Sequence, residues 1–176
     1  MSTINQVERI MHYDEQIEQI ENEIRALQDL APAENTESNL NELLDKLFLQ
    51  LHTLITLKCV ISIEPDNMLV LEAIESHQAL QVLDVALLAQ GMSKQVDNLH
   101  DSLLQANSSD ERFISQTKQL IAEFFIARQM LVDAAINESS EADYFCDCKT
   151  CQQSTYHQFT AAFDFVCTQC EQSFFS

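Results

Sequence analysis

Tyr144-Phe-Cys-Asp-Cys-Lys-Thr-Cys151, followed after fifteen residues by Cys167-Thr-Gln-Cys170, is the stretch that decides the fold of the C-terminal end of this sequence. It contains two Cys-x-x-Cys pairs. A Cys-x-x-Cys turn brings two thiolates to one metal ion from a single tight loop, and two such turns supply the four sulfur ligands of a structural zinc site. We therefore expect a structural Zn²⁺ ion on four ligands: Cys148, Cys151, Cys167 and Cys170.

Aromatic residues gather around these two pairs. Eight of the thirteen Phe and Tyr residues of the chain lie in the segment 144–176. Phe159, Phe163 and Phe165 favour a short strand that leads into the second pair. Small sheets with a thin aromatic core depend on a metal ion for much of their stability. The segment 144–176 is therefore predicted to be a zinc ribbon.

Four alternatives at this site stay open. Cys146 could replace Cys148 as the partner of Cys151, although the regular two-residue gap favours Cys148. Four thiolates also bind iron, and without metal the cysteines could form disulfides or a redox dithiol. Neither pair is followed by glycine, because Gln152 and Glu171 stand at those positions. We expect weaker N–H···S hydrogen bonds there.

The composition predicts a mainly helical chain. The 176 residues include one Gly, two Pro and no Trp, which leaves few turn-forming residues. Long helices joined by short polar loops are the expected result, and the composition argues against glycine-dependent Rossmann, P-loop and all-β folds. We predict a mainly α fold: a helical bundle with a helical hairpin arm and a helix-turn-helix-like segment, followed by the small C-terminal β zinc ribbon.

The segment 1–64 is predicted to form the hairpin arm. Residues 4–31 carry apolar side chains at heptad spacing, which suits one arm of a hairpin and leaves homo-oligomerisation through a short coiled coil open. These side chains are Ile10, Tyr13, Ile17, Ile20, Ile24 and Leu27. After a break at 31–38, Ser38 is the expected N-cap of a second apolar helix that runs to about Ile61. Pro65 is expected to end the arm.

The segment 66–138 is predicted to form a helical domain. We expect helices over 68–79 and 80–90, with Gly91 as the C-cap of the second. Ser93 is then expected to cap a third helix ending near residue 106, which gives 85–104 the rhythm of a helix-turn-helix. Residues 107–109 are expected to cap a long helix over 110–137, and the polar residues 138–143 form a linker to the ribbon.

The net charge of the chain indicates which kinds of molecule it can bind. Nine basic and 28 acidic residues give a formal net charge of −19, which disfavours direct binding of nucleic acid. A basic protein surface or a multi-subunit complex is the expected partner. The most apolar run, 51–63, is too short to span a membrane and contains Lys58 and His52, and no signal peptide is recognised at the N-terminus. We therefore expect a cytoplasmic protein without a membrane partner.

The order of these predicted elements resembles archaeal transcription factor E and the alpha subunit of eukaryotic TFIIE. The elements are a helix-turn-helix over 85–104, a long helix, an acidic linker and the cysteine pairs at 144–151 and 165–170. The resemblance covers residues 66–176. It implies a polymerase-associated factor with a winged-helix domain and a zinc ribbon that contacts the polymerase. In this chain the expected recognition helix carries Asp97 and Asp101 beside Lys94, which favours contacts with protein over a DNA groove.

These observations favour a non-enzymatic adaptor or regulatory subunit of a larger complex that docks through helical faces and a structural zinc ribbon, with the transcription machinery as the best-motivated example. One alternative is a charge-mimicking protein that occupies the nucleic-acid site of a basic partner. Another is a thiol- or metal-dependent enzyme that uses Cys146. Four thiolates close the coordination shell of the metal, and H-E-x-x-H is absent from the sequence. His157, the histidine nearest to the cysteines, is expected at the surface or in a minor core.

Overall fold

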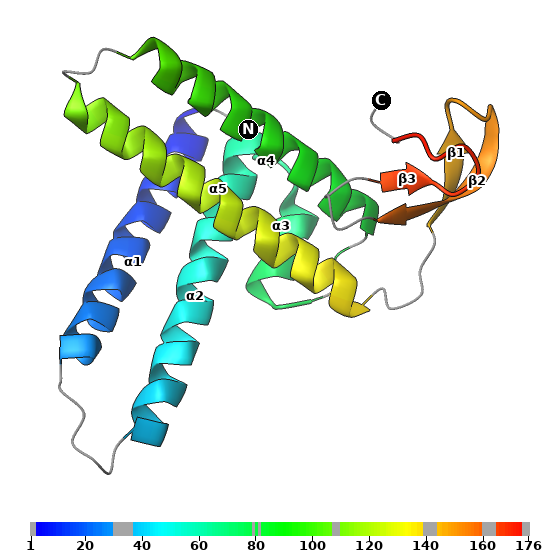
Figure 1. The fold of residues 1–176 in the computed structure, drawn as a ribbon. Helices are drawn as coiled ribbons and strands as arrows, with labels where there is room; N and C mark the ends of the chain where they lie inside the picture. The colour runs from blue at the N-terminus through cyan, green and yellow to red at the C-terminus, as the bar shows by residue number, and fades with distance from the viewer. Residues whose placement is uncertain are drawn as a thin grey trace.

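The computed structural model describes residues 3–29, 37–78, 80, 82–106, 110–138, 144–159 and 165–173. Within these residues, five helices precede a three-stranded sheet, so the predicted mainly α fold with a small C-terminal β module is confirmed (Figure 1). The elements are α1 (Thr3–Asp29), α2 (Glu37–Ile63), α3 (Met68–Glu75), α4 (Val82–Gln105), α5 (Glu111–Glu138), β1 (Tyr144–Cys148), β2 (Gln153–Phe159) and β3 (Phe165–Cys167).

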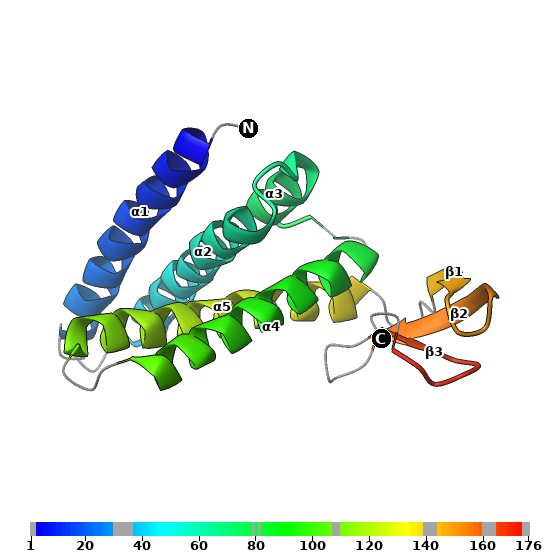
Figure 2. The same cartoon turned by 90° about the horizontal axis from the view of Figure 1, so that it is seen from above.

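The predicted hairpin of the first two helices is present, and α1 lies antiparallel to α2 along its length (Figures 1 and 2). One apolar stripe of α1 is buried, made of Tyr13, Ile17, Ile20 and Ile24. These positions are three or four residues apart and therefore fall on one helix face. The predicted break at 31–38 lies mostly outside the described residues. Helix α2 begins at Glu37, so the prediction of Ser38 as its N-cap is wrong: Ser38 is already helical.

One short turn precedes helix α3, and another follows it. The predicted break around Pro65 is confirmed, and the Asn67 side chain caps α3 by accepting a hydrogen bond from the Val70 N–H. The helix ends at Glu75, four residues before the predicted end. His77 there adopts φ 51°, and Gln78 N–H donates to the Ala73 carbonyl at 2.8 Å. This is a Schellman ending in which histidine occupies the left-handed position usually held by glycine.

The expected turn at Gly91 is wrong. Helix α4 runs without interruption from Val82 to Gln105, so the two predicted helices 80–90 and 93–106 are one, and Gly91 lies in its interior. A Cβ atom at Gly91 would lie 2.9 Å from Cγ2 of Ile63 at the end of α2. The glycine therefore permits a close approach of two helices. Ser93 caps nothing, because its hydroxyl donates to the Ala89 carbonyl of the preceding turn.

Helix α5 completes the helical body. The predicted cap at 107–109 lies outside the described residues, and Asp110 accepts the Phe113 N–H at 3.1 Å as a capping residue does. Helix α5 packs on α2 and α4 (Figure 2). The buried residues from Tyr13 to Val132 form one cluster, so helices on both sides of Pro65 share a single core. The division into an arm 1–64 and a domain 66–138 stays a prediction from sequence.

Helix α2 lies at the centre of this core. From Ile55 to Ile61 every residue of α2 is buried, and the helix contacts α1, α5, α3 and α4. Residues Leu40–Ile63 are also long and apolar enough to cross a membrane, and 56% of the window that meets this criterion is buried inside the protein. A helix at the core of a soluble protein meets the same criterion, so this property carries little weight by itself.

The sheet at the C-terminus has the order β1-β2-β3, and both pairs of strands are antiparallel. The register pairs Cys148 with Gln153 across the first turn and His157 with Cys167 between β2 and β3. Of the expected aromatic strand, Phe159 ends β2, Phe165 begins β3, and Phe163 lies outside the described residues. The sheet projects from the helical body near the C-terminal end of α5 (Figure 1).

Candidate metal centre

The first cysteine pair forms the turn between β1 and β2. Cys148 ends β1, and the chain turns through Cys151 so that the Gln152 N–H donates to the Cys148 carbonyl at 2.9 Å. The Cys151 N–H points at the Cys148 sulfur, 3.4 Å away. Such a turn places both sulfurs on the same side of the loop. Gln152 completes it with φ 54°, a left-handed conformation that glycine adopts at less cost.

The second pair repeats this geometry after β3. The Glu171 N–H donates to the Cys167 carbonyl at 2.9 Å, and Glu171 has φ 56°. The Cys167 N–H in turn donates to the Gln172 carbonyl at 3.0 Å. Neither cysteine pair is followed by glycine, so Gln152 and Glu171 hold the left-handed conformation instead. The backbone is therefore locally strained at these two equivalent positions.

The two turns bring four sulfurs together. All four Sγ atoms of Cys148, Cys151, Cys167 and Cys170 lie within 4.8 Å of one another. Cys148 and Cys170 are 3.7 Å apart, and Cys151 and Cys167 are 3.8 Å apart. Four sulfurs placed tetrahedrally at about 2.3 Å from a zinc ion would be about 3.8 Å from one another. A disulfide needs about 2.05 Å between sulfurs. The four residues therefore fit a single metal ion and could hold one.

The electrostatics of the cluster also suit a cation. The Thr155 hydroxyl and the N–H groups of Cys170 and Gln169 outweigh burial and lower the pKa of Cys167 to about 5. Contact with the Cys170 sulfur, together with burial, raises the pKa of Cys151 to about 12. Without a cation the four sulfurs thus share protons, because adjacent thiolates repel one another. A divalent ion would take the place of those protons.

Thr155 and His157 are buried on β2 beside the cluster, and sequence reasoning did not single out Thr155. Thr155 is 1% exposed and its Oγ1 lies 3.1 Å from the Cys167 sulfur. His157 is fully buried, where a place in a minor core was one of two expectations, and its Nδ1 lies 3.1 Å from the Thr155 carbonyl. The alternation of strand residues could have indicated that both face the same side as the metal site.

Cys146 lies in β1, where the register pairs it with Thr155. Its side chain is outside the described part of the structure, so the alternative in which Cys146 replaces Cys148 stays open. Cys148 itself meets the distance criterion with the other three cysteines.

A second cluster of charged residues lies inside the helical body, and sequence reasoning did not find it. Lys58 Nζ lies 2.6 Å from Asp14 Oδ1 and 2.6 Å from Glu123 Oε2. The side chains of Lys58 and Glu123 are only 9% and 7% exposed, whereas Asp14 is 52% exposed. Burial lowers the pKa of Lys58, but the two carboxylates outweigh burial and leave this pKa raised. The cluster joins α1, α2 and α5. Its one indication in the sequence was the presence of Lys58 in the most apolar run.

Cys59, His12 and His77, three other reactive side chains, lie outside the four-cysteine cluster. Among the described residues, the four cysteines are the only set of three or more His, Cys, Asp or Glu side chains close enough to share a metal ion. Cys59 is buried in the core, where burial raises the pKa of its thiol. His12 and His77 line an open groove of about 540 Å³ between α1, α2 and the end of α3, together with Tyr13 and Glu75.

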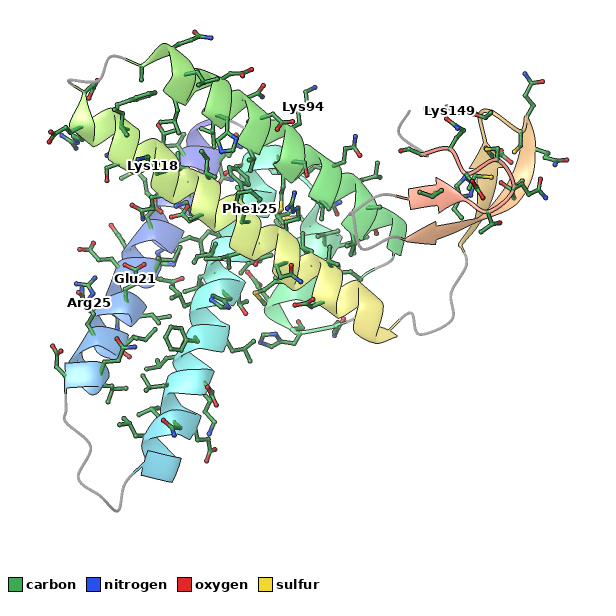
Figure 3. The ribbon with its side chains drawn as sticks, in the orientation of Figure 1. Glu21, Arg25, Lys94, Lys118, Phe125 and Lys149 are labelled. Atoms are coloured by element: carbon green, nitrogen blue, oxygen red, sulfur yellow. The ribbon has the colours of Figure 1, made fainter. Side chains whose placement is uncertain are left out.

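Four basic side chains lie on four separate parts of the molecule. Figure 3 shows Arg25 on α1, Lys94 on α4, Lys118 on α5 and Lys149 on the first cysteine turn. Arg25 lies 3.7 Å from the Glu21 carboxylate one turn away. These four cations therefore do not gather into one surface of the kind that binds phosphates.

Comparison with known proteins gives no assignment. No family model, no curated protein and no solved structure matches this chain.

Proposed function

We propose that the chain is a non-enzymatic acidic adaptor or regulatory subunit of a larger complex, with a C-terminal zinc ribbon over 144–176 that holds a structural Zn²⁺ ion. Cys148, Cys151, Cys167 and Cys170 are the proposed ligands. The observation that carries the proposal is that the four sulfurs lie within 4.8 Å of one another, with two pairs at 3.7 and 3.8 Å, close to the spacing in a tetrahedral zinc site. When bound, the ion would link β1, β2 and β3 and stabilise a sheet too small to hold its fold alone.

The donor set supports a structural role for the metal. Catalytic zinc sites keep one position open for water or substrate and usually include histidine or carboxylate ligands. Here the four sulfurs would fill the shell of a bound ion, and His157 turns its Nδ1 to the Thr155 carbonyl. Iron bound by the same four thiolates is the alternative that metal analysis must separate.

Charge supports a basic protein partner. The chain carries a net charge of −19, and the solvent side of α1 contributes exposed carboxylates in adjacent turns. Glu15, Glu18 and Glu23 line a shallow groove of about 500 Å³ on this helix. Such a field attracts basic protein surfaces, repels phosphates and anionic lipids, and speeds association at low salt.

Transcription machinery is one candidate assembly. The resemblance to factor E and TFIIE alpha included a helix-turn-helix over 85–104, but this segment lies within the uninterrupted helix α4. The support for a transcription partner is therefore the ribbon alone. A charge mimic that occupies the nucleic-acid site of a basic partner is the second candidate function, favoured by the acidic groove on α1.

Affinity purification of the tagged chain, with metal analysis of the same sample, tests the proposal. The expected result is one zinc per chain and a co-purifying protein assembly that resists moderate salt. A charge mimic would release its basic partner as salt screens the charges. Cys170→Ser should lose the metal, and Cys59→Ser, which removes a cysteine of the helical core, is the matched control. A sample without metal, or with thiol-dependent turnover, would contradict the proposal.

A further inference from the structure

The Thr155 hydroxyl lies at the base of the sulfur cluster. Thr155 Oγ1 lies 3.1 Å from the Cys167 sulfur, and both side chains are buried, at 1% and 0% exposure. Cys151 and Cys170, by contrast, are half-buried. Water therefore reaches the outer pair of sulfurs more easily than Cys167. A buried thiolate needs hydrogen-bond donors from the protein in place of water.

Metal binding fixes the direction of this hydrogen bond. In the metal-free cluster either the hydroxyl or the thiol could be the donor. A metal-bound Cys167 has lost its proton and can only accept. The Thr155 O–H must then donate to the sulfur. Four thiolates on one divalent ion carry a net charge of about −2, and a donor that faces one of them reduces the repulsion among them.

We propose that Thr155 is a positioning residue of the metal centre, whose hydroxyl orients and stabilises the Cys167 thiolate as a ligand. The inference rests on the proposed zinc site. It assigns to β2 a direct part in metal affinity, in addition to the two cysteine turns. Loss of a hydrogen-bonding group of this kind typically weakens metal affinity by about 10- to 100-fold.

Thr155→Val is the variant that tests it, because valine keeps the branched shape and the strand preference of threonine but removes the hydroxyl. Thr155→Ser keeps the hydroxyl and removes the methyl group. Ser154→Ala is the matched control one position along β2, since Ser154 is exposed and its hydroxyl contacts Asp147 instead of a cysteine. Each full-length chain is titrated with Co²⁺ and then with Zn²⁺ against a chelator of known affinity, and helical content is followed by circular dichroism.

The expected result is a loss of about 10-fold or more in affinity for Thr155→Val, with Thr155→Ser and Ser154→Ala within a few-fold of the unaltered chain. At saturating Co²⁺ the sulfur-to-cobalt absorption of Thr155→Val should shift, because a thiolate without its donor gives electron density to the metal more readily. A role in packing alone would not require that shift.

Two results overturn the inference, and they are distinguishable. If Thr155→Val binds metal as tightly as the unaltered chain, with unchanged absorption, Thr155 does not act on the site, although the zinc ribbon itself would stand. If the unaltered chain gives no saturable thiolate–cobalt absorption, or Cys167→Ser gives the same absorption, the proposed metal site is wrong and the role of Thr155 falls with it.

Discussion

Replacement of Lys58 by methionine should destabilise the helical body more than any surface substitution. Methionine keeps the apolar stem of the side chain, but it leaves the Glu123 carboxylate, 7% exposed, without its cation. Removing one partner of a buried ion pair typically costs about 3–5 kcal/mol, because the remaining charge stays buried. For a chain of this size, that corresponds to a fall in melting temperature of roughly 6–20 °C.

The two carboxylates around Lys58 should respond unequally. Asp14 is 52% exposed, so Asp14→Asn should cost less than about 1 kcal/mol. Lys58→Met combined with Glu123→Leu removes both buried charges and should recover most of the stability that Lys58→Met alone loses. Denaturant unfolding followed by circular dichroism measures all four free energies of unfolding. A Lys58→Met variant within 1 kcal/mol of the unaltered chain, or a double variant no better than the single one, would refute this account of the cluster.

The pH dependence of the cluster has a defined sign. The pKa of Lys58 is raised above its ordinary value of 10.5 in the folded chain. A raised lysine pKa contributes stability that is present below the unfolded pKa and is lost as pH rises through the folded pKa. The difference in stability between the unaltered chain and Lys58→Met should therefore change little from neutral pH to about pH 10 and shrink only above that. A shrinking difference near neutral pH would contradict the assignment.

The remaining predictions concern backbone positions at which glycine is present or would relieve strain. Gly91→Ala should lower stability by about 1 kcal/mol, because its Cβ would meet Ile63, and in an Ile63→Ala background the sign should reverse. His77→Gly should raise stability by about 0.5 kcal/mol, since His77 holds a left-handed conformation, and no gain in thermal unfolding would argue against strain there. Gln152→Gly with Glu171→Gly should tighten metal binding by about 5-fold in the chelator competition, and weaker binding would contradict the strain assigned to the two turns.

The fold was predictable where periodicity and local turns decide it. The heptad spacing of Ile17 and Ile24 correctly indicates the buried face of α1, and Pro65 correctly marks the end of α2. The spacing of the cysteines likewise selects four residues whose sulfurs meet. Each of these signals lies within one element or one turn, where the local sequence is sufficient.

The errors arose where an atom from a distant segment decides. Gly91 has the sequence signature of a helix end, yet its role depends on the Cγ2 of Ile63 in another helix. The buried charge of Lys58 depends on Asp14 and Glu123, which lie far away in the sequence. The residues next to Gly91 or Lys58 in the sequence do not indicate which distant residues these positions contact in the fold. Thr155 could have been found from strand alternation, although its distance to Cys167 could not.

The most direct test of the central claim is metal analysis of the purified full-length chain beside its Cys167→Ser variant. We predict one zinc per unaltered chain and little or none in the variant, with the helical circular dichroism signal of both nearly the same because α1–α5 have their own core. Full metal content in Cys167→Ser, or an unaltered chain purified with neither zinc nor any other metal, would contradict the assignment of a four-cysteine metal centre.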